Sequence, residues 1–212
     1  MTMKEGTQHD LAIEFLRDGT QSAKAVPGVS HIISTAPSSG TVGGISAANP
    51  YWQNNTELGI VTTTPSAGNI NAALKKMQRA VTRYGGKMPT RICAGQGFIE
   101  KLEQENRAIS HLNVTMNNSG SGTSYDGGVA TTKFDGIPVI WDPTFDEIDS
   151  IDSTTTWTKR AYMVSEDSVV LRPVSGFWML NRKPPRVYDR YVHFWARTCS
   201  YRLTTSRRNG SA

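Results

Sequence analysis

The densest hydrophobic run of the chain occupies residues 134–143 and reads Phe-Asp-Gly-Ile-Pro-Val-Ile-Trp-Asp-Pro. A short run of β-branched and aromatic residues, bounded by Gly136 and Pro143, favours a strand over a helix. Pro138 has no N–H to donate to a sheet ladder, so we expect it at the start of the strand or on an edge. Apolar residues on both strand faces predict burial on both sides, and none of these side chains offers chemistry.

Residues 69–84 carry the clearest helical pattern, because apolar side chains recur at intervals of four, three, four and three while Lys and Arg take the other face. The recurring positions are Ile70, Leu74, Met77, Val81 and Tyr84. Asn69 can cap the start of this helix, and the glycines at 85–86 can end it. We interpret its basic face as a solvated helix face.

The remaining pattern predicts a chain that mixes helices and strands. Further helices are expected at residues 10–17 and 96–107, and further strands at residues 91–94, 161–164, 169–171 and 191–203. Asp18 and Gly19 can end the first helix, since glycine suits the left-handed position after a helix. The fold class predicted in this way is α+β.

Two stretches have the composition of loops. Residues 20–55 contain repeated Pro and Gly turns, and the aromatic pair Tyr51 and Trp52 is expected to pin them to the chain's own core rather than to a neighbouring subunit. Residues 116–128 are rich in Asn, Ser and Gly. Such a composition cannot bury much surface, so we expect a mobile loop there.

The charge of the chain is unevenly distributed. The 212 residues carry a net charge of +5. From Leu171 onward there are nine Lys and Arg and a single acid, Asp189, so this part has a net charge of +8. The first 170 residues therefore have a net charge of −3. This uneven charge permits nucleic-acid contact, and it equally suits subunits that dock a basic end onto an acidic neighbour. We favour the contact between subunits. No apolar run approaches the ~18 residues of a membrane span, and the N-terminus lacks an apolar signal region. We expect a cytoplasmic product without a membrane partner.

The cysteines and histidines do not form a known catalytic pattern. Cys93 and Cys199 are too few and too far apart for a disulfide framework or a CxxC site, so we expect buried, reduced thiols. A hydrolase would have to combine Cys93 or a serine with one of the four histidines, which are His9, His31, His111 and His193. Nucleophile-elbow, metalloprotease and phosphate-loop motifs are all absent from the sequence. We therefore predict no enzyme activity, no cofactor, and no catalytic or cofactor-binding residue.

An acidic cluster follows the central strand. Its members are Asp142, Asp146, Glu147, Asp149 and Asp152. Their spacing does not match a calcium-binding loop, so we predict a solvated acidic loop or a salt-bridge partner for a basic neighbour, and assign no metal.

The basic C-terminal part interleaves cations with aromatic residues, a composition shared with nucleic-acid-binding segments. The residues concerned are Arg182, Lys183, Arg186, Arg190 and Arg197 with Trp178, Tyr188, Tyr191, Phe194 and Trp195. Alternation along 191–203 places apolar residues on both strand faces, which suits a core strand better than a binding platform. We expect any DNA binding to be weak and indifferent to sequence, with Arg207 and Arg208 as phosphate contacts.

Several stretches resemble major capsid proteins of tailed bacteriophages. The similarity lies in Thr-Val-Gly-Gly-Ile-Ser-Ala-Ala-Asn-Pro-Tyr-Trp-Gln-Asn-Asn at 41–55 and in residues 134–143. Phe-Leu-Arg-Asp-Gly-Thr at 15–20, Tyr-Asp-Arg-Tyr at 188–191 and Arg-Arg-Asn at 207–209 are also similar. The order and spacing of these pieces, across nearly the whole chain, carry the resemblance.

The resemblance implies a capsid fold of the Hong Kong 97 type, with an axial domain and part of a peripheral domain. Residues 1–18 would be the end of the spine helix, 19–171 the axial domain, and 172–212 the return through the peripheral sheet with the C-terminal segment. The implied function is a structural head protein of a phage or prophage that forms pentamers or hexamers of a shell around DNA. The alternative is a nucleic-acid-binding protein that uses the basic C-terminal segment.

The capsid proteins that this chain resembles carry an N-terminal arm, an extended loop and most of the spine helix ahead of the position where this sequence begins. Because those parts lie across neighbouring subunits, we expect monomers or weak rings rather than shells. The implied partners are further copies, other phage head proteins, and DNA packaged without sequence specificity. The implied location is the virion, preceded by the bacterial host cytoplasm.

Overall fold

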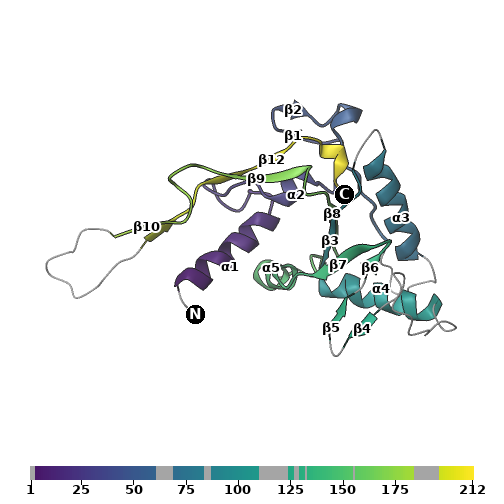
Figure 1. Ribbon diagram of the computed structural model, residues 1–212. Coiled ribbons are helices and arrows are strands. Elements are labelled where there is room, and N and C mark those ends of the chain that lie inside the picture. Colours follow the sequence, from purple (N-terminus) through teal and green to yellow (C-terminus); the bar gives the residue numbers. More distant parts are fainter. Residues whose placement is uncertain are drawn as a thin grey trace. The chain divides into compact units, whose positions relative to one another are not determined.

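The computed structural model describes residues 3–60, 69–83, 87–109, 124–126, 129–131, 133–154, 156–183 and 196–212 (Figure 1). The chain forms two compact units. Unit 1 comprises Met1–His31 and Val170–Thr204, and unit 2 comprises Ile32–Val169 and Thr205–Ala212. Among the described helices, none combines the length and the hydrophobicity that a bilayer crossing requires.

Unit 2 holds most of the regular structure. Its helices are α3 (Asn69–Thr82), α4 (Gln96–Ile109), α5 (Thr144–Asp152) and the 3-10 turns η1 (Pro50–Trp52) and η2 (Arg208–Gly210). Its strands are β1 (Thr41–Val42), β2 (Ile45–Ser46), β3 (Arg91–Ala94), β4 (Ser124–Asp126), β5 (Val129–Thr131), β6 (Lys133–Phe134), β7 (Ile137–Trp141) and β8 (Ala161–Val164). The strands expected at 91–94 and 161–164 are thereby confirmed.

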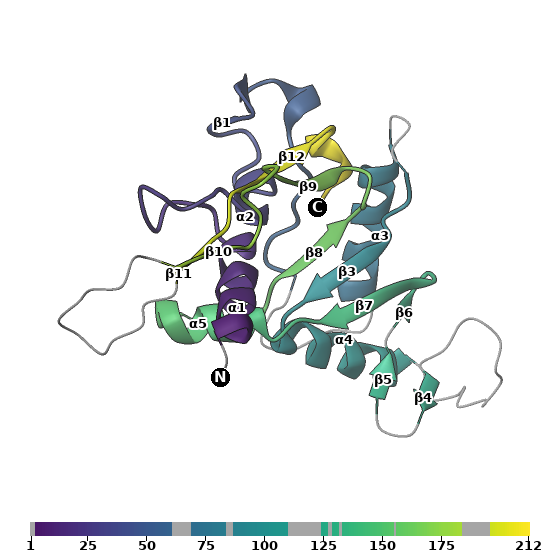
Figure 2. The ribbon, with the colours of Figure 1, turned by 60° about the vertical axis from the view of Figure 1, so that its left-hand side comes forward.

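A four-stranded mixed sheet in the order β6-β7-β3-β8 forms the centre of unit 2. β3 runs parallel to β7, with Ile92 opposite Val139, and antiparallel to β8, with Ile92 opposite Met163. Figure 2 shows β7, β3 and β8 side by side. The run at 134–143 therefore supplies a strand of the central sheet, as its pattern predicts.

One face of this sheet is packed against helices. The main hydrophobic cluster joins Ile92, Val139 and Met163 on the sheet to Leu74 of α3 and Leu102 of α4. On the opposite face, Phe145 of α5 lies 5.8 Å from Tyr162, measured between ring centroids.

Burial of β7 is one-sided, which corrects the expectation that both of its faces are buried. Val139 is 5% exposed, whereas Ile140, on the other face of the strand, is 40% exposed. Trp141 shares the face of Val139 but ends the strand and is 53% exposed. The helices α3 and α4 cover the Val139 face, while α5 reaches the other face at Tyr162 of β8. Hydrophobic composition alone therefore overstated how much of this strand is covered.

A tight turn sets the start of β7. Asp135 and Gly136 connect β6 to β7 with φ angles of 48° and 81°, the left-handed pair that a two-residue type I′ hairpin requires. Pro138 pairs with Lys133 of β6, one residue before the first pair between β7 and β3. It thus lies at the start of the strand, as predicted from its missing N–H.

The two amphipathic helices of unit 2 form where their patterns predict them. In α3, Ile70, Leu74 and Val81 are buried and Met77 packs against the same cluster. Residues 84–86, the expected end of this helix, lie outside the described residues. The helix expected at 96–107 is α4, which continues to Ile109.

A buried carboxylate caps the start of α3. Glu105 of α4 is 1% exposed, and its two oxygens accept the backbone N–H groups of Ile70 at 2.7 Å and Asn71 at 3.1 Å. A negative charge there satisfies donors that have no partner within the helix and complements the helix dipole. The sequence had suggested Asn69 for this role.

The acidic cluster at 142–152 lies largely on a helix, which corrects the prediction of a loop. Asp149 is 6% exposed and accepts hydrogen bonds from the Thr154 hydroxyl and from the backbone N–H groups of Trp157 and Thr158. Burial alone would raise the pKa of the Asp149 carboxyl, but these hydrogen bonds hold it below its usual value. Asp149 therefore orders the chain after α5, while the other four acids remain nearer the surface.

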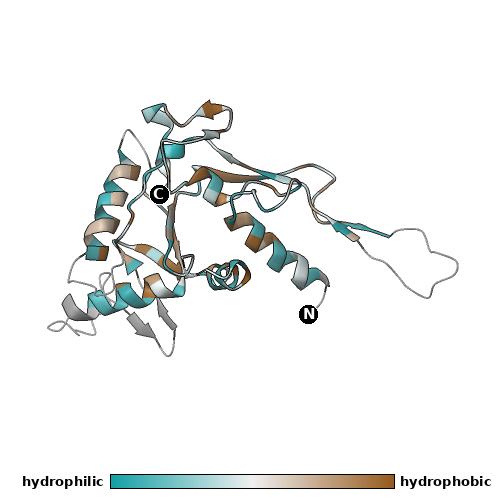
Figure 3. Ribbon diagram, turned by 180° about the vertical axis from the view of Figure 1, so that it is seen from behind, coloured by the Kyte–Doolittle hydropathy of each residue, from teal (hydrophilic) through white to brown (hydrophobic). Residues whose placement is uncertain are grey.

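Unit 1 is built from α1 (Met3–Leu16) and α2 (Val29–Ile32, whose last residue belongs to unit 2) with β9 (Val169–Pro173), β10 (Leu180–Arg182), β11 (Ala196–Thr198) and β12 (Tyr201–Thr205). α1 extends the helix expected at 10–17 toward the N-terminus, and Figure 3 shows hydrophobic and hydrophilic residues alternating along it. Gly19 has φ 89°, the left-handed conformation expected after this helix. β9 contains the strand expected at 169–171.

The strand expected at 191–203 is interrupted. Its described part divides into β11 and β12, with Cys199 and Ser200 between them. The backbone of Ser200 bonds instead to Val174 and Phe177. Residues 191–195 and most of the loop expected at 116–128 lie outside the described residues, and the expected domain boundaries stay a prediction.

We predict that replacing Glu105 by Ala lowers the free energy of unfolding by about 2–3 kcal/mol, because two buried N–H groups of α3 lose a charged acceptor. Glu105→Gln should cost less, since one carbonyl oxygen remains. Urea unfolding followed by circular dichroism measures both variants, with the exposed neighbour Gln104→Ala as control. A loss as small as that of the control would contradict the capping role.

Candidate functional site

The side chain of Arg208 is the largest fully buried one among the described residues. It lies in η2, with an exposed fraction of 0%. Its Nε donates to the carbonyl oxygen of Ile32 at 2.7 Å, and its Nη1 donates to those of Pro37 at 3.4 Å and Trp52 at 3.3 Å. The guanidinium of Arg208 thus holds together three positions of residues 20–55, which we call the turn-rich segment.

The position of Arg208 corrects the expectation that it contacts phosphate. Burial lowers the pKa of the guanidinium from its usual value, and no carboxylate in the described residues forms an ion pair with it. Because it is withdrawn from solvent, it cannot reach a nucleic acid without unfolding its surroundings. Arg207 is half-buried, and its predicted phosphate contact stays a prediction.

The residues that follow Arg208 are also part of unit 2's interior. Ala212 exchanges two backbone hydrogen bonds with Met163 of β8, with N···O distances of 2.6 and 3.1 Å. Ser211 accepts the backbone N–H of Asn55 at 3.3 Å, and its hydroxyl lies 3.0 Å from that of Ser168. This segment, residues 207–212, therefore links the turn-rich segment to the central sheet.

The two aromatic residues of the turn-rich segment have different roles. Trp52 is half-buried, and its indole N–H donates to the Val42 carbonyl oxygen at 2.9 Å, so it pins the segment within the chain as expected. Tyr51 is 81% exposed. Only one member of the pair is thus an internal anchor.

Cys93 lies in β3 with its thiol half-buried. Burial raises the pKa of this thiol, the nearby Asp142 charge raises it further, and Arg91 opposes both. A raised pKa reduces the reactive thiolate fraction at neutral pH, the opposite of what a catalytic cysteine needs. Both cysteines are free.

The two described histidines belong to a different unit from Cys93. His9 lies in α1 of unit 1 and His31 in α2, while His111 and His193 fall outside the described residues. Within the described part of the chain, no cluster of three or more His, Cys, Asp or Glu side chains could hold a metal ion.

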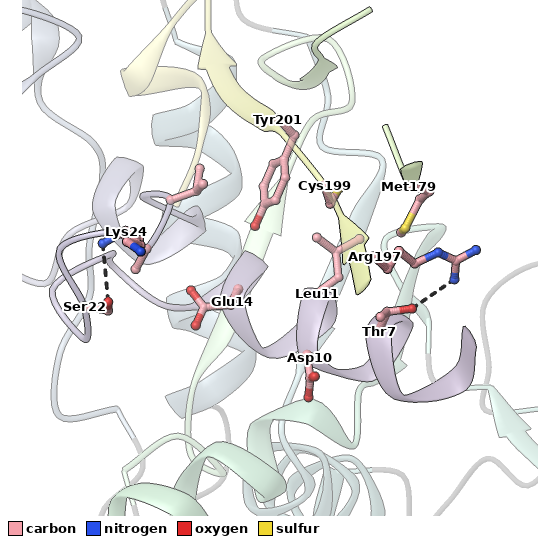
Figure 4. Close-up of a pocket in the computed structure, with 12 residues that line it drawn as sticks. Thr7, Asp10, Leu11, Glu14, Ser22, Lys24, Met179, Arg197, Cys199 and Tyr201 are labelled. Atoms are coloured by element: carbon pink, nitrogen blue, oxygen red, sulfur yellow. Dashed lines mark hydrogen bonds between the residues drawn. The ribbon is translucent and has the colours of Figure 1, made fainter. Parts of the chain in front are cut away.

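A pocket of about 350 Å³ lies within unit 1 (Figure 4). α1, the segment around Lys24 and the strands β11 and β12 supply its walls. Arg197 Nη1 donates to Thr7 Oγ1 at 3.1 Å across one side. Burial and the Glu14 charge raise the pKa of the Tyr201 hydroxyl, which keeps it protonated at neutral pH. Charges of both signs line the pocket, and no histidine is among the described lining residues.

The basic C-terminal part is described only in part. Arg182 and Lys183 are exposed, whereas Arg197 is half-buried against Thr7. Trp178 meets Tyr201 edge to face, with centroids 6.3 Å apart. Arg186, Arg190 and the aromatic residues between 188 and 195 lie outside the described residues.

Comparison with known proteins identifies a fold. No protein-family description matches the sequence, and no curated protein matches it. A solved structure, the "Cyanophage A-1(L) capsid asymmetric unit", matches with a TM-score of 0.55 and 18% sequence identity. The match covers 94% of this chain and 62% of the other, so this chain spans less than two thirds of the length of that capsid chain. The chain thus has a mixed helix and strand fold that resembles the fold of a phage capsid protein.

We predict slow labelling of Cys93 by a thiol reagent in the native protein at neutral pH, because its raised pKa leaves little thiolate. A Cys199→Ala variant isolates the signal of Cys93, and the same variant in urea gives the rate of the unmasked thiol. Raising the pH should speed the native reaction. Rapid stoichiometric labelling at neutral pH would show that Cys93 is an activated thiol.

We further predict that Arg208→Ala lowers the free energy of unfolding by about 3 kcal/mol, because three carbonyl oxygens lose their buried donor. Arg208→Lys should recover only part of this loss, since lysine lacks the planar fork. The exposed Arg202→Ala is the matched control, and urea unfolding is the measurement. Equal stability of the Arg208 and Arg202 variants would contradict the anchoring role.

Proposed function

We propose that this chain is a structural subunit of the head of a tailed phage or prophage. In this proposal, copies associate into pentamers or hexamers of an icosahedral shell that encloses DNA without reading its sequence. The observation that carries the proposal is the shared fold, which extends over 94% of this chain. The proposed role is structural rather than catalytic.

The finer assignment is a fold of the Hong Kong 97 type. We assign residues 19–171 to the axial domain, residues 1–18 to the spine helix of the peripheral domain, and residues 172–212 to the peripheral sheet and C-terminal segment. Unit 1 supports a scheme of this kind, because it also combines an early and a late segment of the chain, although residues 205–212 belong to unit 2. The proposed location is the virion, after synthesis in the host cytoplasm.

A primary role in nucleic-acid binding has less support. Arg208, one of the nine cations of the basic C-terminal part, is buried. Exposed cations such as Arg182 and Lys183 are still available for weak phosphate contact, as a shell protein that encloses DNA would need.

The proposal predicts that the purified protein associates as its concentration rises. Light scattering and electron microscopy across a concentration series should show rings of pentamers or hexamers, because repeated head-to-tail contacts close when their rotation allows. Strict monomers at every soluble concentration would contradict the proposed role of this chain.

A further inference from the structure

One exposed surface of unit 2 combines acids with large apolar side chains. We define the acidic patch as Trp141, Asp146, Glu147, Ile151 and Asp152. Trp141 is 53% and Ile151 56% exposed. No Lys or Arg occurs between residues 134 and 158, so the charges of this stretch are all negative.

The geometry of α5 groups these residues. Phe145, Ile148 and Asp149 take its buried side, and the 3.6-residue period places the half-buried Asp146 and Glu147 and the exposed Ile151 toward the other. Asp152 follows Ile148 by four residues and is exposed because it ends the helix. Trp141 precedes the helix, and its indole N–H donates to Asp146 Oδ2 at 3.1 Å. An indole and a helix face are therefore held together as one surface.

A surface of the opposite charge lies in unit 1. We define the basic ribbon as residues 170–183, which form β9, β10 and the connection between them. Val174, Phe177 and Leu180 are 46%, 44% and 40% exposed. Arg172, Arg182 and Lys183 supply positive charge, and no Asp or Glu occurs from residue 168 to residue 188.

Each strand of the basic ribbon has one pairing partner within the described chain. β9 pairs with β12 alone and β10 with β11 alone, so each is a two-stranded sheet. Two-stranded ribbons are marginally stable in water, and clustered exposed apolar side chains mark interaction surfaces. The ribbon is therefore suited to being covered by a partner.

We propose that the basic ribbon of one copy docks onto the acidic patch of a second copy. This inference rests on the proposed function and assigns its subunit contact. Phe177 and Leu180 would meet Trp141 and Ile151 at the centre, while the cations of the ribbon would face Glu147 and Asp152 around them. An apolar centre with complementary charges is the usual anatomy of a specific protein interface.

The composition of the two surfaces favours a second copy over a nucleic acid. A duplex backbone selects polar, positive surfaces, whereas the basic ribbon exposes Val174, Phe177 and Leu180 beside its cations. The acidic patch would repel phosphate. Because the two surfaces differ, the contact is head-to-tail, and each copy keeps one surface of each kind for the next copy.

A charge-swap experiment tests this pairing. The ribbon variant is Arg172→Glu with Arg182→Glu, and the patch variant is Glu147→Lys with Asp152→Lys. The control is Lys75→Glu with Arg79→Glu, which makes the same charge change on the exposed face of α3. Sedimentation measures association of each protein alone and of the ribbon and patch variants mixed in equal amounts, and circular dichroism checks their folding.

Each swapped variant alone should associate at least about tenfold more weakly than the original, because like charges then face each other. The control should associate as the original does. The equimolar mixture should regain association, since the acidic ribbon meets the basic patch and the unchanged ribbon meets the unchanged patch. Association of the original should also weaken with added salt, which screens exposed charges.

The other outcomes overturn the proposal in distinguishable ways. If the original associates but the swaps change nothing, the docking surfaces are wrong while the proposed function stands. If both variants weaken association and the mixture does not restore it, the two surfaces do not pair with each other. If the variants alter the melting temperature independently of concentration, the charges act within one copy. If the original and the mixture stay monomeric throughout, both the docking and the proposed function fail.

Discussion

The arrangement of unit 2 depends on a buried cation. Arg208 is fully withdrawn from solvent, and its Nε and Nη1 donate to the carbonyl oxygens of Ile32, Pro37 and Trp52. A segment with so little regular structure cannot satisfy its own backbone groups, and buried carbonyls without a donor are costly. The guanidinium meets that need from a single position, and the carbonyl dipoles in turn offset part of its own desolvation. Local irregularity and a buried charge thus stabilise each other.

The C-terminal segment, residues 207–212, protects an edge of the central sheet. Ala212 pairs with Met163 of β8, so the open side of β8 is partly occupied by the chain itself. β6 forms the other end of the sheet and contains only two residues. The central sheet of unit 2 therefore exposes little strand edge, whereas the two-stranded pairs of both units have unpaired edges in the described part of the chain.

Charge is also grouped along the chain. Five acids lie on or next to α5, and the buried Asp149 among them orders the chain that follows, while unit 1 carries several cations on or beside its described strands. A chain of low overall charge can therefore present two strongly charged surfaces of opposite sign. For a protein with a capsid-like fold and no assigned catalytic residue, such a distribution directs attention to contacts between copies rather than to the pocket beneath α1.

By itself, the sequence determined the elements whose causes are local. The apolar spacing of α3, the punctuation of β7 by Gly136 and Pro143, and the run that forms β3 each specify their own structure. Only the tertiary structure decided what covers those elements. Nothing near Arg208 distinguishes a buried anchor from an exposed tail, nothing near Glu105 marks it as the cap of another helix, and Ile140 is as apolar as its buried neighbour Val139. Burial and capping are set by segments far away in the chain, and a local pattern contains no information about which distant segment packs against it.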